Sequence, residues 1–335
     1  MGFSEPGKCG QKSYDPTTLW PTRRLRQVAG ATNKGIPQAL VGEGADYGAC
    51  MPAAARPLVC GIASPEAGGL ARFAAAQASR LGVGLVLAHA AEAPYVADRP
   101  FSSQSERIRE AEELKRAGLV QQVLEPVAEG IGEEVEALVR FEEPARALRE
   151  AAAEHGATLL VVGHRRLGAL DRVVVGSTSG ALVREAPCPV LVVAEGSGDS
   201  WEEARPLIVC GIDGSDDADH AARTAAALAK RCDYDLVLAS VSEAGDSDLA
   251  RTVATAELIA GPSRVKVEQR DGDAAEELAE SGRRHRAALV VVGSRGRGEV
   301  RAAVLGSVSN RLLELAGGPV VVVPPGAAIP DAPGG

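Results

Sequence analysis

The second half of the chain alternates short apolar runs with longer amphipathic stretches. Short runs rich in Val, Ile and Leu indicate buried strands, and amphipathic stretches between them indicate helices that cover both faces of a parallel sheet. The pattern therefore predicts an α/β fold. The predicted strands are "LIVCGI" at 207–212, "DLVLASV" at 235–241, "RVKVEQ" at 264–269, "ALVVVGS" at 288–294 and "PVVVV" at 319–323.

Three helices are predicted between or after these strands, at 217–232, 273–286 and 307–317. Asp273 and Ser307 stand where the last two begin, and such side chains accept hydrogen bonds from the free N–H groups of a first helical turn. We therefore expect both residues to be N-caps. Ligands of parallel sheets bind beyond the carboxyl ends of the strands. The turns "DGSDD" and "GSRGRG" both follow strands, so we expect them to meet there.

The first half of the chain repeats this order of elements. "PLVCGIASPEAGG" parallels "PLIVCGIDGSDDAD", so that Gly61 matches Gly211, while Gly163 later matches Gly293. The spacing between matched glycines falls from 150 to 130 residues, so the first copy holds about twenty extra residues. They lie within 101–132, which is predicted to be helical at its charged start and to cover the edge of the sheet.

Two tandem domains follow from the repeat and from the length of 335 residues. The stretch between the copies has linker composition, and the ends of the chain are rich in Gly, Pro and polar residues without a sustained apolar period. The predicted organisation is a disordered leader at 1–55, a first domain at 56–194, a linker at 195–205, a second domain at 206–325 and a disordered tail at 326–335.

The leader raises the question of where the natural chain starts. Met1 and Met51 are its two methionines, and Met51 stands just ahead of the first predicted strand. We hypothesise that translation starts at Met51 and that the leader is not translated. No basic start followed by an apolar core indicates a secretory signal, and no apolar run approaches the roughly eighteen residues of a membrane span. The cytoplasm is therefore the expected location.

Composition narrows the classes of partner and chemistry. A net charge of −9 repels nucleic acid phosphate, and 3% aromatic residues leave few rings for stacking on bases, so nucleic acid is not an expected partner. The six cysteines show no CxxC spacing, which gives no signal for a metal site or a redox pair. Cys60 and Cys210 lie inside apolar runs, where we expect buried, unreactive thiols.

The segment "GSRGRGEVRAAVLGSVSN", from Gly293 to Asn310, carries the strongest chemical signal. Glycines allow backbone N–H groups to curl around an anion and allow phosphate to approach the main chain. A helix that begins at Gly306 and Ser307 would add free N–H groups and its positive dipole end, with the hydroxyls of Ser307 and Ser309 as further donors. The alternative is that the glycines only shape a tight turn and Ser307 only caps its helix.

The spacing Gly293, two residues, Gly296, nine residues, Gly306, Ser307 resembles the nucleotide-binding signature of the universal stress protein family, G-2x-G-9x-G-S/T. Residues 56 to 325 resemble two such domains in tandem. The resemblance implies two doubly wound α/β domains of the adenine nucleotide alpha hydrolase-like fold, each with five parallel strands, and ATP, alone or with Mg²⁺, as the ligand. It also implies a binding site formed by Asp213 and Val241 at the adenine, Val292, Gly293, Arg295 and Gly296 at ribose and phosphates, and Gly306, Ser307, Val308 and Ser309 at the phosphate end.

The first copy departs from this signature. Arg166 stands where the second copy has Gly296, Ala63 replaces Asp213, and "GIASP" lacks the glycine of "GIDGS". An arginine at the point of closest backbone approach would fill part of the cradle, so we expect a degenerate site and one ATP per chain, in the second domain. The glycines and serines that remain, Gly163, Gly176, Ser177 and Ser179, leave anion binding open, with Arg165 or Arg166 as a partner.

No catalytic residue is predicted. His164 lies in the loop of the first copy without a triad or ligand partner, so we expect an ordinary exposed side chain, and we interpret His155, His220 and His285 on predicted helices in the same way.

Three classes of function follow: a nucleotide-binding stress or signalling module, a slow ATP-hydrolysing enzyme, and a ligand-free scaffold.

Members of the resembled family commonly pair through the edge strand after the signature. We therefore expect "CPVLVVAE" and "GPVVVVPP" to pair antiparallel within one chain, as an internal pseudo-dimer, and we expect a homodimer of the chain as a further possibility.

Overall fold

The computed structural model describes residues 26–27, 56–92, 104–131, 135–164, 176–194, 204–241, 246–296 and 305–327. The predicted leader lies outside the described residues except for 26–27, and most of the predicted linker and tail lie outside them too.

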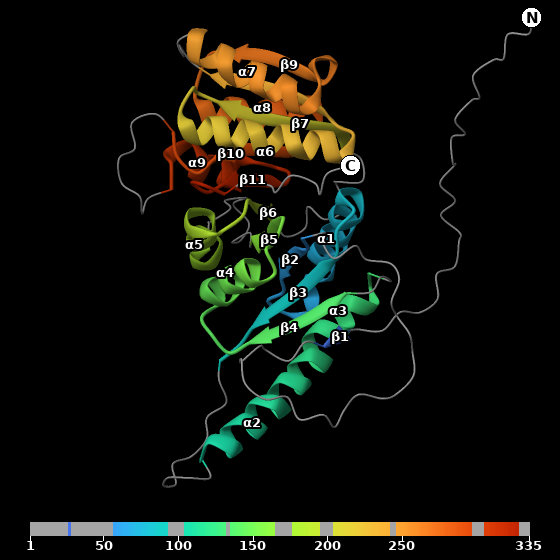
Figure 1. Cartoon of the computed structure of the whole chain (residues 1–335). Helices are drawn as coiled ribbons and strands as arrows, with labels where there is room; N and C mark the ends of the chain where they lie inside the picture. The colour runs from blue at the N-terminus through green and yellow to red at the C-terminus, as the bar shows by residue number, and fades with distance from the viewer. Residues whose placement is uncertain are drawn as a thin grey trace, which may run out of the picture.

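The first half of the chain forms a parallel β-sheet layered with helices (Figure 1). Its strands are apolar runs whose residues are almost all buried, as expected for strands covered on both faces. In chain order its elements are β1 Arg26–Gln27, β2 Leu58–Gly61, the 3-10 turn η1 Pro65–Ala67, α1 Gly68–Leu81, β3 Leu85–Ala90, α2 Gln104–Leu119, the π-helical segment η2 Val120–Leu124, α3 Glu125–Glu129, β4 Glu136–Arg140, α4 Pro144–Glu154, β5 Leu159–His164, α5 Ser177–Glu185 and β6 Val190–Ala194.

The second half repeats this arrangement and confirms the predicted α/β fold. Five parallel strands alternate with helices, and each predicted strand is present to within two residues at either end. Its elements are β7 Arg205–Ile212, α6 Asp216–Cys232, β8 Asp235–Val241, α7 Asp246–Ala260, the 3-10 turn η4 Pro262–Arg264, β9 Val265–Arg270, α8 Ala274–His285, β10 Ala287–Gly293, α9 Ser307–Leu315 and β11 Val320–Val323.

The two halves share one sheet of eleven described strands in the order β1-β4-β3-β2-β5-β6-β11-β10-β7-β8-β9. The described pairs are parallel except at the junction, where β6 and β11 run antiparallel with Val321 opposite Leu191. This junction confirms the antiparallel pairing predicted from the two apolar edge strands. It places the first half below and the second half above it in Figure 1. A homodimer of the whole chain stays a prediction.

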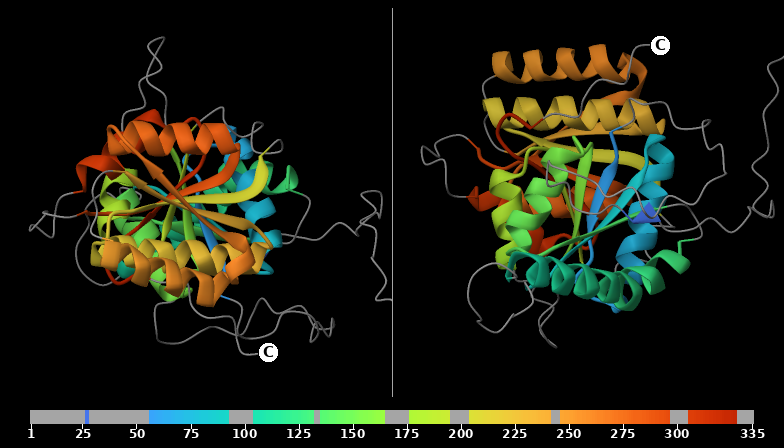
Figure 2. Two further views of the ribbon diagram at one scale, coloured as in Figure 1. Left: turned by 90° about the horizontal axis from the view of Figure 1, so that it is seen from above. Right: turned by 60° about the horizontal axis from the view of Figure 1, so that its bottom comes forward.

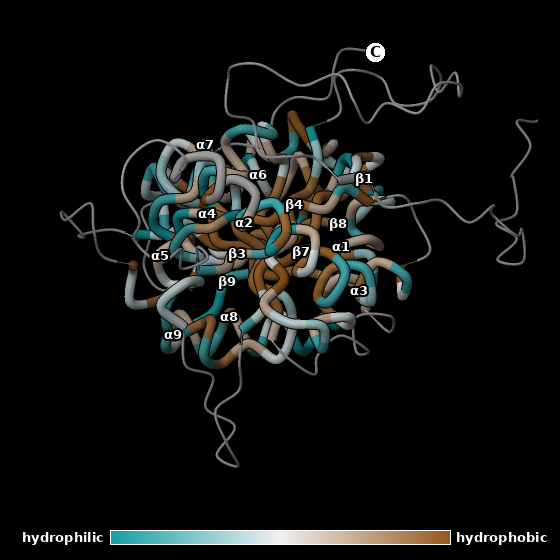
Figure 3. Tube along the Cα trace, turned by 90° about the horizontal axis from the view of Figure 1, so that it is seen from below, coloured by the Kyte–Doolittle hydropathy of each residue, from teal (hydrophilic) through white to brown (hydrophobic). Residues whose placement is uncertain are grey.

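Each face of the shared sheet has a core that runs through both halves. One core lies under α1 and α6 and contains Leu191 of β6 together with Val321 of β11. The other lies under α4, α5, α8 and α9. Figure 2 shows helices on both sides of the twisted sheet, and in Figure 3 the apolar strands form the centre of the molecule. Arg231 of α6 also donates a hydrogen bond to the carbonyl of Leu81 at the end of α1, at 2.9 Å.

One of the two expected N-caps needs correction, and one helix was not predicted. Asp273 caps α8 as predicted, because its Oδ1 accepts from the N–H of Glu276 at 3.0 Å. Ser307 is not the N-cap: the N-cap of α9 is Gly306, and Ser307 is the first helical residue. Helix α7 was not predicted, since its apolar residues are interrupted by small and polar ones and produce a weak helical period.

The insert of the first half is helical, as predicted. Its described part consists of α2, η2 and α3, and Figure 1 shows α2 projecting away from the sheet. Arg116 of α2 donates a hydrogen bond to the carbonyl of Val139 in β4 and also lies over the ring of Phe141. The insert therefore contacts β4. Within the sheet, β4 also pairs with β1, which is part of the predicted leader. A chain that began at Met51 would lack β1.

The described cysteines are buried or half-buried. Cys60 and Cys210 are completely buried, as predicted, and burial raises the pKa of both thiols. Burial also raises the pKa of Cys188 to about 12 and that of Cys232 to about 11. A thiol with a raised pKa is a poor nucleophile. Among the described residues, no helix is long and apolar enough to cross a membrane.

Candidate functional site

A cavity of about 340 Å³ lies beyond the carboxyl ends of β7, β8 and β10. Asp213 of "DGSDD" and the described part of "GSRGRG", residues 293–296, meet there, as the pattern of strands predicts. The structure brings all ten predicted site residues together around this cavity, although their binding of a ligand stays a prediction. They are Asp213, Val241, Val292, Gly293, Arg295, Gly296, Gly306, Ser307, Val308 and Ser309.

One wall of the cavity is apolar and was not predicted. It contains Ala239, two residues before Val241 on β8, and Leu278 of α8, with Ala274 at the start of the same helix. Side chains two apart on a strand point to the same face, so Ala239 could have been found from the position of Val241. Leu278 comes from a different element, and only the packing of α8 on the sheet brings it to the cavity.

Asp213 is held in place by the turn that follows β7. Its Oδ1 accepts hydrogen bonds from the backbone N–H of Ser215 at 2.9 Å and from the Ser215 hydroxyl at 2.6 Å. The Ser215 hydroxyl in turn accepts from the N–H of Ala218 and caps α6. Gly214 takes a φ of 77°, a left-handed conformation that glycine adopts without strain. The turn thus fixes the Asp213 carboxylate at the cavity.

The glycines of the loop after β10 allow close approach of other groups. A Cβ at Gly296 would lie 2.9 Å from Oδ2 of Asp213, and a Cβ at Gly293 would lie 2.8 Å from the carbonyl oxygen of Asp217 in α6. Real Cβ atoms essentially never come this close to another heavy atom. Both positions therefore require glycine as the loop is built here.

The start of α9 closes the other side of the cavity. The N–H of Gly306 donates to the carbonyl of Ser294 at 2.7 Å, which ties the helix start to the loop. The Ser309 hydroxyl donates to the carbonyl of Gly293 at 2.6 Å. This bond joins the first turn of α9 to the end of β10, and donation by Ser309 to a ligand stays a prediction. Ser309 still lines the cavity and holds α9 to β10.

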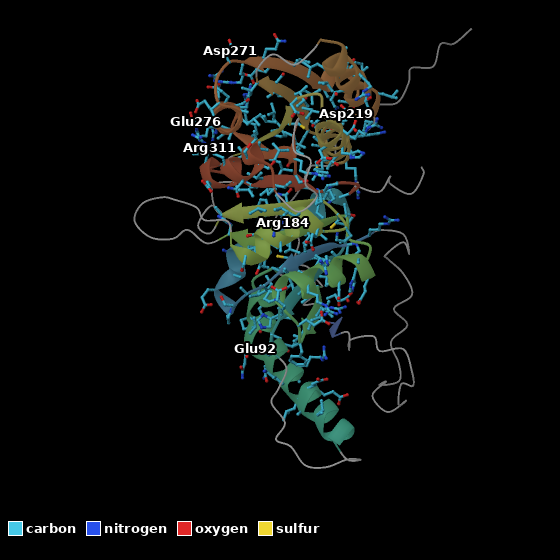
Figure 4. All side chains as sticks on the ribbon, turned by 90° about the vertical axis from the view of Figure 1, so that its left-hand side faces the viewer. Glu92, Arg184, Asp219, Asp271, Glu276 and Arg311 are labelled. Atoms are coloured by element: carbon cyan, nitrogen blue, oxygen red, sulfur yellow. The ribbon has the colours of Figure 1, made fainter. Side chains whose placement is uncertain are left out.

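Helix α9 is also fixed on its outer side. Arg311 forms an ion pair with Glu276 of α8 and lies 3.6 Å from a carboxylate oxygen of Asp273. In Figure 4 Arg311 and Glu276 lie side by side on one flank of the second half. The half-exposed ion pairs contribute little to stability one by one, but they hold the helix whose first residues line the cavity.

The corresponding region of the first half is built differently. A Cβ at Gly163 would meet the end of the Leu70 side chain at 3.2 Å, where Gly293 meets main-chain atoms. The Ser179 hydroxyl donates to the carbonyl of Gly176 at 3.3 Å. Ala63 is exposed and supplies no carboxylate. Arg165 and Arg166 lie outside the described residues, so the predicted obstruction by Arg166 stays a prediction.

His164 is not the exposed residue that was expected. At the end of β5 it is only 2% exposed, and neither ring nitrogen has a hydrogen-bond partner among the described residues. Burial lowers its pKa, an effect opposed by the charge of Glu314 in α9. Its counterpart in the second half is Ser294, which is equally buried. The position after the glycine is therefore buried in both halves, at the last residue of β5 and directly after the end of β10.

Stability at mildly acid pH should depend on His164. A histidine whose pKa is lowered in the folded state favours folding above its unfolded value, near 6.5, and loses that contribution as the pH falls. His164→Ser, which installs the residue of the second half, should reduce the loss of unfolding free energy as the pH falls. Urea unfolding of both proteins from about pH 7 to pH 5 tests the slope. Parallel slopes would show that His164 titrates normally.

The other histidines differ from the expectation in part. His220 is exposed on α6, as predicted. His155, just after α4, donates a hydrogen bond from Nε2 to Oε1 of Glu136 in β4 at 2.9 Å, and this bond raises the pKa of His155. His285 at the end of α8 lies 3.2 Å from Glu268 of β9. Both half-buried pairs tie a helix to an outer strand of the sheet. The shared role was not visible in the sequence, because each pair joins residues on different elements.

Comparisons with known proteins agree on one family. The profile of the universal stress protein family matches residues 55–194 and again 206–324. A universal stress protein of Mycolicibacterium smegmatis is 34% identical over 283 residues, which cover 78% of this chain and 94% of that protein. The universal stress protein Rv2005c of Mycobacterium tuberculosis is 34% identical over 186 residues, or 50% of this chain and 61% of that protein. Among solved structures, a universal stress protein from Archaeoglobus fulgidus covers 81% of this chain and 99% of its own, with a TM-score of 0.58 at 18% identity, and so shares the fold.

Proposed function

Because the chain belongs to the universal stress protein family, we propose that it is a stress-response or signalling module that binds one adenine nucleotide, ATP, in its second half. One observation carries the proposal: the residues of the glycine signature and the two predicted adenine contacts, although far apart in sequence, line a single cavity. Binding would change the interactions of the module with a partner.

The cavity fits an adenine nucleotide in size and in chemistry. Its volume of about 340 Å³ lies within the range of small-molecule sites, roughly 300–1,000 Å³. Its apolar wall, with Ala239, Val241 and Leu278, suits a flat base, and the fixed Asp213 carboxylate suits the amino group of adenine. At Gly296 the loop lies so close to Asp213 that an added Cβ would be 2.9 Å from its Oδ2.

The phosphate end would lie against the start of α9. The first N–H groups of a helix have no intrahelical partner, and the positive end of its dipole attracts anions. Ser307 and Val308 supply such N–H groups, and the guanidinium of Arg295 supplies positive charge on the opposite side. The bound nucleotide would contribute negative charge, and the chain would contribute donors that are already in position.

Nucleotide that co-purifies with the protein tests the proposal. The protein is purified without added nucleotide and denatured by heat, and the supernatant is separated by ion-exchange chromatography. We expect ATP or its breakdown products at up to one equivalent per chain. A nucleotide-free preparation that also fails to bind added ATP would favour the ligand-free scaffold. A steady-state phosphate-release assay distinguishes a binding module from a slow ATP-hydrolysing enzyme, and the module should release none above background.

A further inference from the structure

Asp217, in the first turn of α6, lies beside the glycine loop and was not among the predicted site residues. Its Oδ2 accepts a hydrogen bond from Nε of Arg295 at 3.0 Å. The two side chains are mostly buried, with 16% and 23% of their surfaces exposed. They come from elements separated by 78 residues, so the pair joins α6 to the loop after β10.

The same residue touches the loop a second time through its backbone. A Cβ at Gly293 would lie 2.8 Å from the carbonyl oxygen of Asp217, so the loop begins in direct contact with α6. Two residues later, Arg295 reaches back to the Asp217 carboxylate. The main-chain contact and the ion pair together fix both ends of the segment Gly293–Arg295 on one helical turn.

The N–H group of Arg295 that bonds Asp217 determines which of its other N–H groups can face a ligand. Arginine has five N–H donors in a planar fork, and here Asp217 engages the one on Nε. Arg295 lines the cavity, and its two Nη groups carry the four remaining N–H donors. A guanidinium held in this way loses less side-chain freedom when it binds phosphate than a free one.

The described residues of the first half are arranged differently. Once the glycine missing from "GIASP" is allowed for, Ser64 matches Ser215 and Glu66 matches Asp217. Glu66 is exposed, and a hydrogen bond with Ser64 lowers its pKa. At the matching point of the loop, Gly163 faces the side chain of Leu70. The pair between helix and glycine loop is thus seen in the half that retains the full glycine signature, and Arg165, the counterpart of Arg295, lies outside the described residues.

We propose that Asp217 is a positioning residue for phosphate binding, which holds the Arg295 guanidinium by Nε so that its Nη donors serve the phosphates. The inference rests on the proposed function, since it concerns the same cavity. It assigns Asp217 an indirect role, because a carboxylate would repel a phosphate that it touched.

Titration calorimetry with ATP and with adenosine tests this role. Asp217→Ala should weaken ATP binding about three- to tenfold, the cost of ordering one free arginine side chain. Adenosine lacks phosphate and should bind unchanged. Asp217→Asn keeps an acceptor for Nε and should retain most of the ATP affinity. The matched control is Asp216→Ala, which removes an exposed acidic residue from the same helical turn and should leave both affinities unchanged.

Two further results decide the inference. In an Arg295→Gln background, Asp217→Ala should have no additional effect, because the side chain that it positions is gone. Tighter or unchanged ATP binding by Asp217→Ala would show that the carboxylate repels phosphate or has no role, and equal weakening of ATP and adenosine would show general damage to the fold. Each of these outcomes overturns the inference about Asp217 and leaves the proposed function standing. A wild-type protein that binds neither ATP nor adenosine overturns the proposed function with it.

Discussion

Gly296→Arg should weaken ATP binding by at least tenfold. The substitution copies the residue of the first half into the second and adds a Cβ that would lie 2.9 Å from Oδ2 of Asp213. That carboxylate cannot easily move aside, because its other oxygen is bonded twice to Ser215. The arginine side chain would also fill space where the loop lies closest to Asp213. A lost hydrogen bond to a charged group costs about 1.5–3 kcal/mol, which is about tenfold or more in affinity.

Isothermal titration of wild type and Gly296→Arg measures this effect, with circular dichroism to confirm that the variant is folded. The reverse change in the first half, Arg166→Gly, serves as the comparison. It should restore little binding there, since Ala63 and the shortened turn leave the base without a carboxylate. Unaltered affinity in Gly296→Arg would contradict the interpretation of the glycine loop.

Gly293→Ala should reduce stability and ATP affinity together. The added Cβ would lie 2.8 Å from the carbonyl oxygen and 2.9 Å from the carbonyl carbon of Asp217. These are main-chain atoms at the start of α6, so relief requires the helix or the loop to shift. Forcing an extra carbon into a packed interior typically costs about 1–3 kcal/mol. The shift would also separate Arg295 from Asp217, and ATP should bind several times more weakly.

Gly163→Ala is the matched control, because it is the same substitution at the matching position of the first half. Its Cβ would meet the end of the Leu70 side chain at 3.2 Å, and that side chain can rotate. We expect a loss of under about 1 kcal/mol and unchanged ATP affinity. Urea unfolding gives both free energies. Equal destabilisation by the two substitutions would mean that the loops are equivalent and that the contact with α6 has no special role.

Local pattern was sufficient to predict much of the fold. The apolar runs locate the strands because a strand covered on both faces has no polar side to interrupt it. Asp273 was identified as a cap because a cap depends on residues three or four positions away. The resemblance to the universal stress protein family and the two apolar edge strands together predicted the antiparallel junction of β6 and β11.

The glycines of the candidate site could be predicted from their spacing, because each lies where the backbone packs closely against other atoms. Gly293, Gly296 and Gly306 lie where added Cβ atoms would collide with other atoms, so their spacing reflects the shape of the loop. The sequence did not reveal which partner each polar group takes. The hydroxyl of Ser309 bonds a carbonyl of β10, and Arg295 bonds a carboxylate of α6. These contacts join distant segments, and no local pattern encodes them.

The burial of His164 was missed for the same reason. A histidine after a glycine in a polar loop resembles a surface residue, but β5 extends through His164 and carries it into the interior. The continuity of the two cores was also not predicted. The junction strands were expected to pair, yet pairing at that edge also makes each core continuous with the other.

The number of nucleotides bound per chain tests the central claim most directly. Wild-type protein, stripped of endogenous nucleotide, is titrated with ATP in a calorimeter, and the stoichiometry is compared with that of Gly296→Arg. The complete signature and the carboxylate of Asp213 occur in the second half alone, so we predict one site per chain that is lost or strongly weakened in the variant. Two equivalent sites in the wild type, or one site that survives unchanged in Gly296→Arg, would contradict the account.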